Sequence, residues 1–160
     1  MAASVRDTSA SDHIRVLFVC THNSARSQIA EALLEHDGGP TFEVESAGTE
    51  ATRVRPEAIA VLAESGIDWT RAESKTLERF LDQPFDYVVT VCDRARETCP
   101  VFPGARNTLH WSLDDPSEVE GTEEERLEAF RRTKREIAAR LRPFVETALA
   151  AGGLRDGSPG

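Results

Sequence analysis

In the stretch CTHNSAR, a cysteine, Cys20, is followed six residues later by an arginine, Arg26. A cysteine thiolate is a strong nucleophile, and an arginine guanidinium presents a planar fork of donors that matches two oxygens of a tetrahedral anion. Ser24 and Ser27 offer hydroxyls near the sulfur, and Asn23 can fix a loop through bonds between its side chain and the backbone. These residue types suit nucleophilic attack on a bound oxyanion.

The elements on either side of this stretch predict how it is positioned. Residues 14–19 form a continuous apolar run typical of a buried strand, and residues 27–36 have helical spacing. Backbone N–H groups at a helix start lack intrahelical partners and attract anions, and the same field favours the thiolate form of Cys20. A buried structural cysteine with an unrelated surface arginine accounts less well for this combination. We therefore predict an oxyanion-binding loop made of Thr21, His22, Asn23, Ser24, Ala25, Arg26 and Ser27.

Two further cysteines, Cys92 and Cys99, flank the sequence DRARET. Their spacing is too wide for a redoxin motif, and no histidine or fourth thiol lies nearby in the sequence to complete a zinc site. Cys92 ends a predicted strand, so we expect it at the same rim of the sheet as Cys20, and Arg94 and Arg96 favour nearby thiolates. Two purely structural thiols are the alternative.

Strand patterns alternate with helical patterns along the rest of the chain. The predicted strands are residues 14–19, 42–48, 85–92 and 107–113, and the predicted helices are residues 27–36, 55–66, 93–99 and 122–149. Thr122 and Glu125 form a capping-box pattern at the start of the last helix. Such alternation predicts an α/β fold with a mostly parallel, doubly wound sheet that binds ligands at the carboxyl ends of its strands.

Length and composition predict one soluble domain. The 160 residues carry a net charge of −9, which argues against a nucleic-acid partner, and no apolar stretch is long enough for a membrane span or a signal peptide. We expect a disordered tail over 1–12, one domain over 13–150 and a flexible tail over 151–160. A cytoplasmic monomer with reduced thiols fits these features.

The sequence CTHNSARSQ resembles the phosphate-binding loop of the low-molecular-weight tyrosine phosphatase fold, and more closely that of arsenate reductases built on this fold. ESAGTE, VVTVCDRARETCP and HWSLDDP follow in the expected order, so the resemblance covers residues 14–149. The chain departs from it at His22, where glycine is common, and at Ala25, where cysteine is common. The resemblance implies a three-layer, flavodoxin-like fold with a four-stranded parallel sheet and helices on both faces.

The same resemblance implies a reaction and its residues. Cys20 attacks arsenate held by Arg26 and the loop, and Asp115 acts as the general acid. Cys92 then forms a disulfide with Cys20 and releases arsenite. Cys99 next attacks Cys92, so that the disulfide moves outward to the Cys92–Cys99 pair. Thioredoxin reduces that disulfide, so the chain would detoxify arsenic without a bound cofactor.

Three other interpretations remain open from the sequence. A tyrosine phosphatase of this fold would carry tyrosines after the Asp-Pro pair, where this chain has Ser117 and Glu118. A reductase coupled to mycothiol would not need Cys92 and Cys99. A non-catalytic anion sensor would need neither these cysteines nor Asp115, although an aspartate before a proline is often only a turn residue.

Some members of the resembled family bind potassium beside the loop. Their asparagine and glutamate ligands match Asn23 and Glu31, but their further acidic ligand aligns at about Lys75. This lysine argues against a potassium ion, because its ammonium can occupy the same place. The alternative is that Lys75 is a solvated helix residue.

Overall fold

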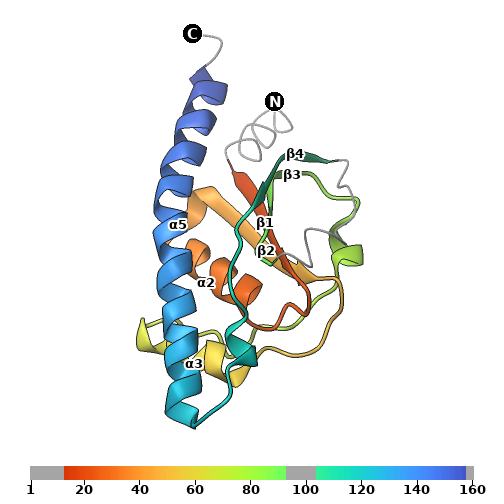
Figure 1. The fold of residues 1–160 in the computed structure, drawn as a ribbon. Coiled ribbons are helices and arrows are strands. Elements are labelled where there is room, and N and C mark those ends of the chain that lie inside the picture. Colours follow the sequence, from red (N-terminus) through yellow and green to blue (C-terminus); the bar gives the residue numbers. More distant parts are fainter. Residues whose placement is uncertain (1–12, 93–103, 158–160) are drawn as a thin grey trace.

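The computed structural model describes residues 13–92 and 104–157 (Figure 1). The predicted tail at 1–12 lies outside the described residues, as do the last three residues, 158–160, of the tail predicted over 151–160. So does the segment 93–103, which contains Cys99, Arg94, Arg96 and the predicted short helix.

Four parallel strands form one sheet in the order β2-β1-β3-β4, which confirms the predicted four-stranded parallel sheet. The strands are β1 (Ile14–Cys20), β2 (Phe42–Gly48), β3 (Phe85–Thr90) and β4 (Ala105–His110). The two central strands are the most continuously apolar, as expected for strands that are buried on both faces. Because all four run the same way, their carboxyl ends share one edge, which is the lower edge in Figure 1.

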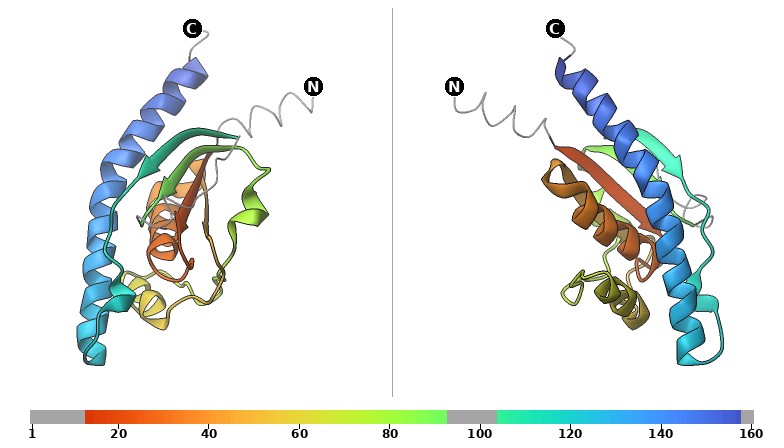
Figure 2. Two further views of the ribbon diagram at one scale, coloured as in Figure 1. Left: turned by 45° about the vertical axis from the view of Figure 1, so that its right-hand side comes forward. Right: turned by 90° about the vertical axis from the view of Figure 1, so that its left-hand side faces the viewer.

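Three long helices and three short 3-10 turns complete the described fold. The helices are α2 (Arg26–Gly38), α3 (Pro56–Glu64) and α5 (Glu123–Gly157), and the turns are η1 (Gly39–Thr41), η2 (Leu77–Phe80) and η3 (Pro116–Glu118). Figure 2 shows α2 and α5 on one side of the sheet and η2 on the other. Helix α3 extends the helical layer past the carboxyl edge, where it packs against α5.

Helix α5 begins as the sequence predicts and ends later. The backbone N–H of Glu125 donates to Thr122 Oγ1 over 3.1 Å, and the N–H of Thr122 donates to Glu125 Oε1 over 2.8 Å, so the capping box is confirmed. The helix continues to Gly157, beyond the predicted end near 149 and into the segment expected to be a tail. A glycine pair costs about 1 kcal/mol per residue in a helix, but it does not forbid helical backbone angles.

Strand β4 ends at His110, three residues earlier than predicted. The next residues leave the sheet because their side chains pack elsewhere: Trp111 contacts Phe18 of β1 and Phe144 of α5, with ring centroids 5.8 and 5.9 Å apart. The segment that follows β4 therefore runs along the carboxyl edge of the sheet toward η3 (Figure 1).

Polar contacts tie α3 to α5. Arg131 pairs with Glu64 over 2.9 Å, and Lys134 Nζ donates to the carbonyl of Val61 over 2.9 Å and to Ser65 Oγ over 2.7 Å. Among residues 13–92 and 104–157, no helix has both the length and the apolar character that crossing a membrane requires.

Candidate active site

The candidate nucleophile lies where β1 meets α2. Cys20 is the last residue of β1, and Ser27, in the first turn of α2, places its Oγ 2.8 Å from Cys20 Sγ. Both residues are buried. Because the first N–H groups of a helix have no intrahelical acceptor, the loop 21–25 ends at a natural anion-binding position.

Asn23 organises this loop. Its φ of 52° is the one left-handed value among the described non-glycine residues, and asparagine tolerates that region better than most residues. Its Oδ1 accepts from the backbone N–H of Lys75 over 2.8 Å and from Gln28 Nε2 over 2.9 Å, which fixes the orientation of its amide. Asn23 Nδ2 therefore donates to Ser27 Oγ over 2.8 Å. Ser27 Oγ therefore accepts from Asn23 and lies within hydrogen-bond distance of Cys20 Sγ, so Asn23 and Ser27 connect the loop to the candidate nucleophile.

A buried ion pair lies beneath the loop. Asn23 Nδ2 also donates to Ser46 Oγ over 2.9 Å, and Ser46 donates to Glu31 Oε1 over 2.5 Å. The same carboxylate oxygen lies 3.8 Å from Lys75 Nζ, and both charged side chains are about nine-tenths buried. Burial raises the pKa of Glu31 to about 7, although the Lys75 ammonium and the Ser46 hydroxyl both act to lower it.

The backbone after β2 packs tightly on the loop. A Cβ at Gly48 would lie 2.7 Å from the backbone of Asn23 and of Thr21, so only glycine allows this approach. The Glu50 N–H donates to the Thr21 carbonyl over 2.9 Å. His22, which replaces the common glycine, has a negative φ and an exposed side chain, so the substitution leaves the loop unstrained.

Arg26 and Asp115 lie together although 89 residues separate them in sequence. Arg26 Nη1 donates to the carbonyl of Leu113 over 2.9 Å, and its Nη2 lies 3.4 Å from Asp115 Oδ2. The other carboxylate oxygen, Oδ1, accepts from the N–H and the hydroxyl of Ser117 over 2.9 and 2.6 Å. Three of the five guanidinium donors remain for an anion, and Oδ2 is the Asp115 oxygen that faces Arg26.

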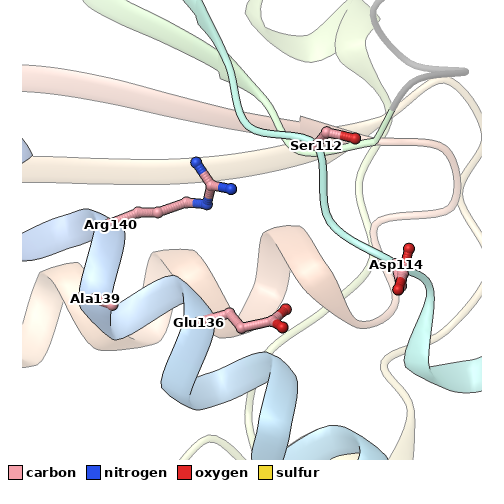
Figure 3. Close-up of a pocket in the computed structure, with 5 residues that line it drawn as sticks. All are labelled: Ser112, Asp114, Glu136, Ala139 and Arg140. Carbon is pink, nitrogen blue, oxygen red and sulfur yellow. The ribbon is translucent and has the colours of Figure 1, made fainter.

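The outer side of this segment lines a shallow pocket of about 410 Å³ (Figure 3). Ser112 and Asp114 lie on one wall, and Glu136 and Arg140 point toward them from α5. Asp114 makes no hydrogen bond or ion pair with the described part of the chain. Within 112–115, alternate residues therefore face the pocket and the loop, which assigns Asp115 rather than Asp114 to the site.

The second cysteine of the sequence analysis also reaches this loop. Cys92 Sγ lies 3.3 Å from the hydroxyl of Thr21, the residue directly after Cys20, and both cysteines are nearly inaccessible, at 2% and 4% exposure. Cys99 lies outside the described residues. No cluster of metal-ligating side chains is present among the described residues.

Sequence reasoning overlooked two residues that build the site. Ser46 lies on the inward side of β2, in line with Phe42 and Val44, and Gln28 is fully buried on α2, where it also accepts from Trp69 Nε1 over 2.9 Å. In both cases the available signal was a polar residue on an otherwise buried face.

Comparisons with known proteins identify a family and relatives for this chain. Residues 15–152 match the family described as low molecular weight phosphotyrosine protein phosphatase. An arsenate reductase of Halalkalibacterium halodurans is 42% identical over 132 residues, which is 82% of this chain and 95% of that protein.

Solved structures are similar too. One is an arsenate reductase in a phosphate-binding state, with a TM-score of 0.73 and 31% identity over 84% of this chain and 98% of that one. Another is a thioredoxin-dependent arsenate reductase of Corynebacterium glutamicum, with a TM-score of 0.60 and 34% identity over 91% of this chain and 68% of that one.

Proposed function

The chain belongs to the low molecular weight phosphotyrosine protein phosphatase family, and from this we propose that it is an arsenate reductase whose nucleophile is Cys20. The contact between the Thr21 hydroxyl and Cys92 Sγ, at 3.3 Å, carries the proposal. A phosphatase needs one thiol at the anion loop, whereas a reductase that forms an internal disulfide needs a second thiol close by to accept oxidation.

The first step is substitution at arsenic. The Cys20 thiolate attacks arsenate held by Arg26 and the loop, so an S–As bond forms as an As–O bond breaks. Asp115 Oδ2 donates a proton to the leaving oxygen, which departs as water. The position of Asp115 beside Arg26, with Oδ2 at 3.4 Å, places this carboxyl next to the proposed anion site and in that way supports the assignment.

The second step transfers electrons. The Cys92 thiolate attacks Cys20 Sγ, and an S–S bond forms as the S–As bond breaks. The electron pair of that bond stays on arsenic, which leaves as arsenite. Two thiols are thereby oxidised by two electrons, and arsenic(V) is reduced to arsenic(III).

The burial of both thiols bears on how the disulfide is reduced. Cys20 and Cys92 are only 2% and 4% exposed, which argues against direct attack by a protein reductant. We propose that Cys99 attacks Cys92, releases the Cys20 thiolate and presents a Cys92–Cys99 disulfide to cytoplasmic thioredoxin. The name of the Corynebacterium relative supports thioredoxin over mycothiol as the reductant. We propose that the chain acts as a monomer, in the cytoplasm, without a nucleic-acid or membrane partner.

A direct assay tests the proposed function. Arsenite release with thioredoxin, thioredoxin reductase and NADPH should be observed, and p-nitrophenyl phosphate hydrolysis should be weak by comparison. The phosphatase assay is included because the matched family is named for that activity and phosphate resembles arsenate in shape and charge. Hydrolysis without any arsenite release would favour the phosphatase interpretation.

Replacing the candidate general acid should slow the first step selectively. Asp115→Asn removes the proton donor but keeps an acceptor for Ser117, so we expect kcat for both reactions to fall about 10²-fold or more. Inhibition by inorganic phosphate should change much less. The matched control is Asp114→Asn, which alters the neighbouring, exposed carboxylate. Equal losses in the two variants would contradict the assignment.

The residues beside the loop do not fit a potassium ion. The place beside Glu31 Oε1 is taken by the Lys75 ammonium, at 3.8 Å, and Lys75 is buried outside any helix, unlike the solvated helix residue considered from the sequence. We therefore propose that the chain works without this cation. Thermal melts in potassium and sodium chloride at equal ionic strength should give the same Tm. Lys75→Asp should introduce a preference for potassium, and a preference in the unmutated protein would contradict the proposal.

A further inference from the structure

Lys75 and Glu31 form a closed ring of contacts with the loop. The backbone N–H of Lys75 holds Asn23 Oδ1, Asn23 Nδ2 holds Ser46, Ser46 donates to Glu31, and Glu31 pairs with the Lys75 side chain. Asn23 links this ring to Ser27 Oγ, which contacts Cys20 Sγ. Three hydrogen-bonded side chains, those of Ser46, Asn23 and Ser27, therefore connect the Glu31 carboxylate to the nucleophile.

We propose that Lys75 is a positioning residue that supplies a fixed positive charge beneath the oxyanion loop and offsets the negative charge of Glu31. This inference deepens the proposed function, since it concerns how the same loop binds its anion. A buried carboxylate without a counter-charge would repel both the Cys20 thiolate and an incoming oxyanion. A tethered ammonium removes that repulsion and needs no free cation.

The charges around Glu31 determine the pH range in which the single variants change the net charge beneath the loop. Lys75 is its cationic neighbour, and Glu35 on α2 and Glu45 on β2 add negative potential. Because burial raises the pKa of Glu31 to about 7, its carboxyl is mostly neutral in acid and mostly ionised above that pH. Above pH 7, the pair is neutral in the wild type and positive in Glu31→Gln. In Lys75→Met it becomes negative only at a higher pH, because loss of the ammonium removes the charge that lowers the Glu31 pKa.

These charges predict opposite effects for the two single variants. At a pH above the raised Glu31 pKa of this variant, Lys75→Met should weaken inorganic phosphate binding by about tenfold, the order of magnitude expected for one unit charge acting through the protein, and the midpoint pH of Cys20 alkylation by iodoacetamide should rise. Glu31→Gln keeps the acceptor for Ser46, and it should lower the midpoint and strengthen phosphate binding. The double variant is neutral and should return close to wild type, and Lys75→Arg should behave like wild type.

The experiment measures alkylation and phosphate binding in a background in which Cys92 and Cys99 are serines, so neither readout depends on arsenate reduction. The chain's only other lysine provides the control, because Lys134→Met removes a partly buried ammonium that bonds Val61 and Ser65 far from the loop. If Lys75→Met does not fold, Glu31→Gln still tests the predicted direction of the shifts in alkylation midpoint and phosphate binding. Shifts in the same direction for both single variants, no shift in Glu31→Gln, or no difference between Lys75→Met and Lys134→Met would overturn the proposal.

Discussion

Cys20→Ser is expected to abolish both arsenate reduction and p-nitrophenyl phosphate hydrolysis, with losses of at least about 10³-fold in kcat/KM. Both reactions begin with the same sulfur attacking a tetrahedral anion. A serine hydroxyl at this position stays protonated near neutral pH, and the neighbouring Ser27 hydroxyl, 2.8 Å away, is too weak a base to remove its proton. The fold should tolerate the change, because serine has the same side-chain shape as cysteine with an oxygen in place of the sulfur.

The measurement should separate catalysis from binding. Inorganic phosphate should still bind to Cys20→Ser, since Arg26 and the loop amides are unchanged, and its thermal melt should resemble that of the wild type. Retention of either activity would show that another residue starts the reaction. Loss of activity together with loss of the fold would leave Cys20→Ala as the variant to compare, with phosphate binding as its readout.

Cys92→Ser is expected to separate the two reactions. Turnover of arsenate with thioredoxin should fall to background, because no thiol next to Thr21 can attack Cys20 once arsenic is bound. Hydrolysis of p-nitrophenyl phosphate should stay within about threefold of wild type, since water rather than a second thiol completes that reaction.

Cys99→Ser provides the matched comparison for this relay. It should also lose multiple turnover, but it should still complete one reduction and accumulate a Cys20–Cys92 disulfide. Peptide mapping after a single turnover should find Cys92–Cys99 in the wild type. Full multiple-turnover activity in either variant would exclude the three-thiol relay and favour a small-thiol reductant.

The local features of the site could be read from the sequence because they depend on neighbouring residues. An apolar run before Cys20, helical spacing after Arg26 and a six-residue step between them predicted the strand, the loop and the helix start, and the structure has all three. Strand–helix alternation likewise predicted the parallel sheet, since only a few topologies can cover such strands. The extent of α5 was predicted less well, because a glycine pair discourages a helix without ending it.

The contacts that distinguish this site join residues far apart in the chain, and the tertiary structure alone decided them. The sequence placed Asp115 before a proline, but the path of the segment after β4 brought it 3.4 Å from Arg26 and turned Asp114 away. The sequence left Lys75 either solvated or beside Glu31, and burial against the loop decided for Glu31. Ser46 and Gln28 escaped notice because a polar residue on a buried face predicts that a partner exists without saying which one. Local spacing determines elements, whereas the partner of a buried polar group depends on which segments pack together.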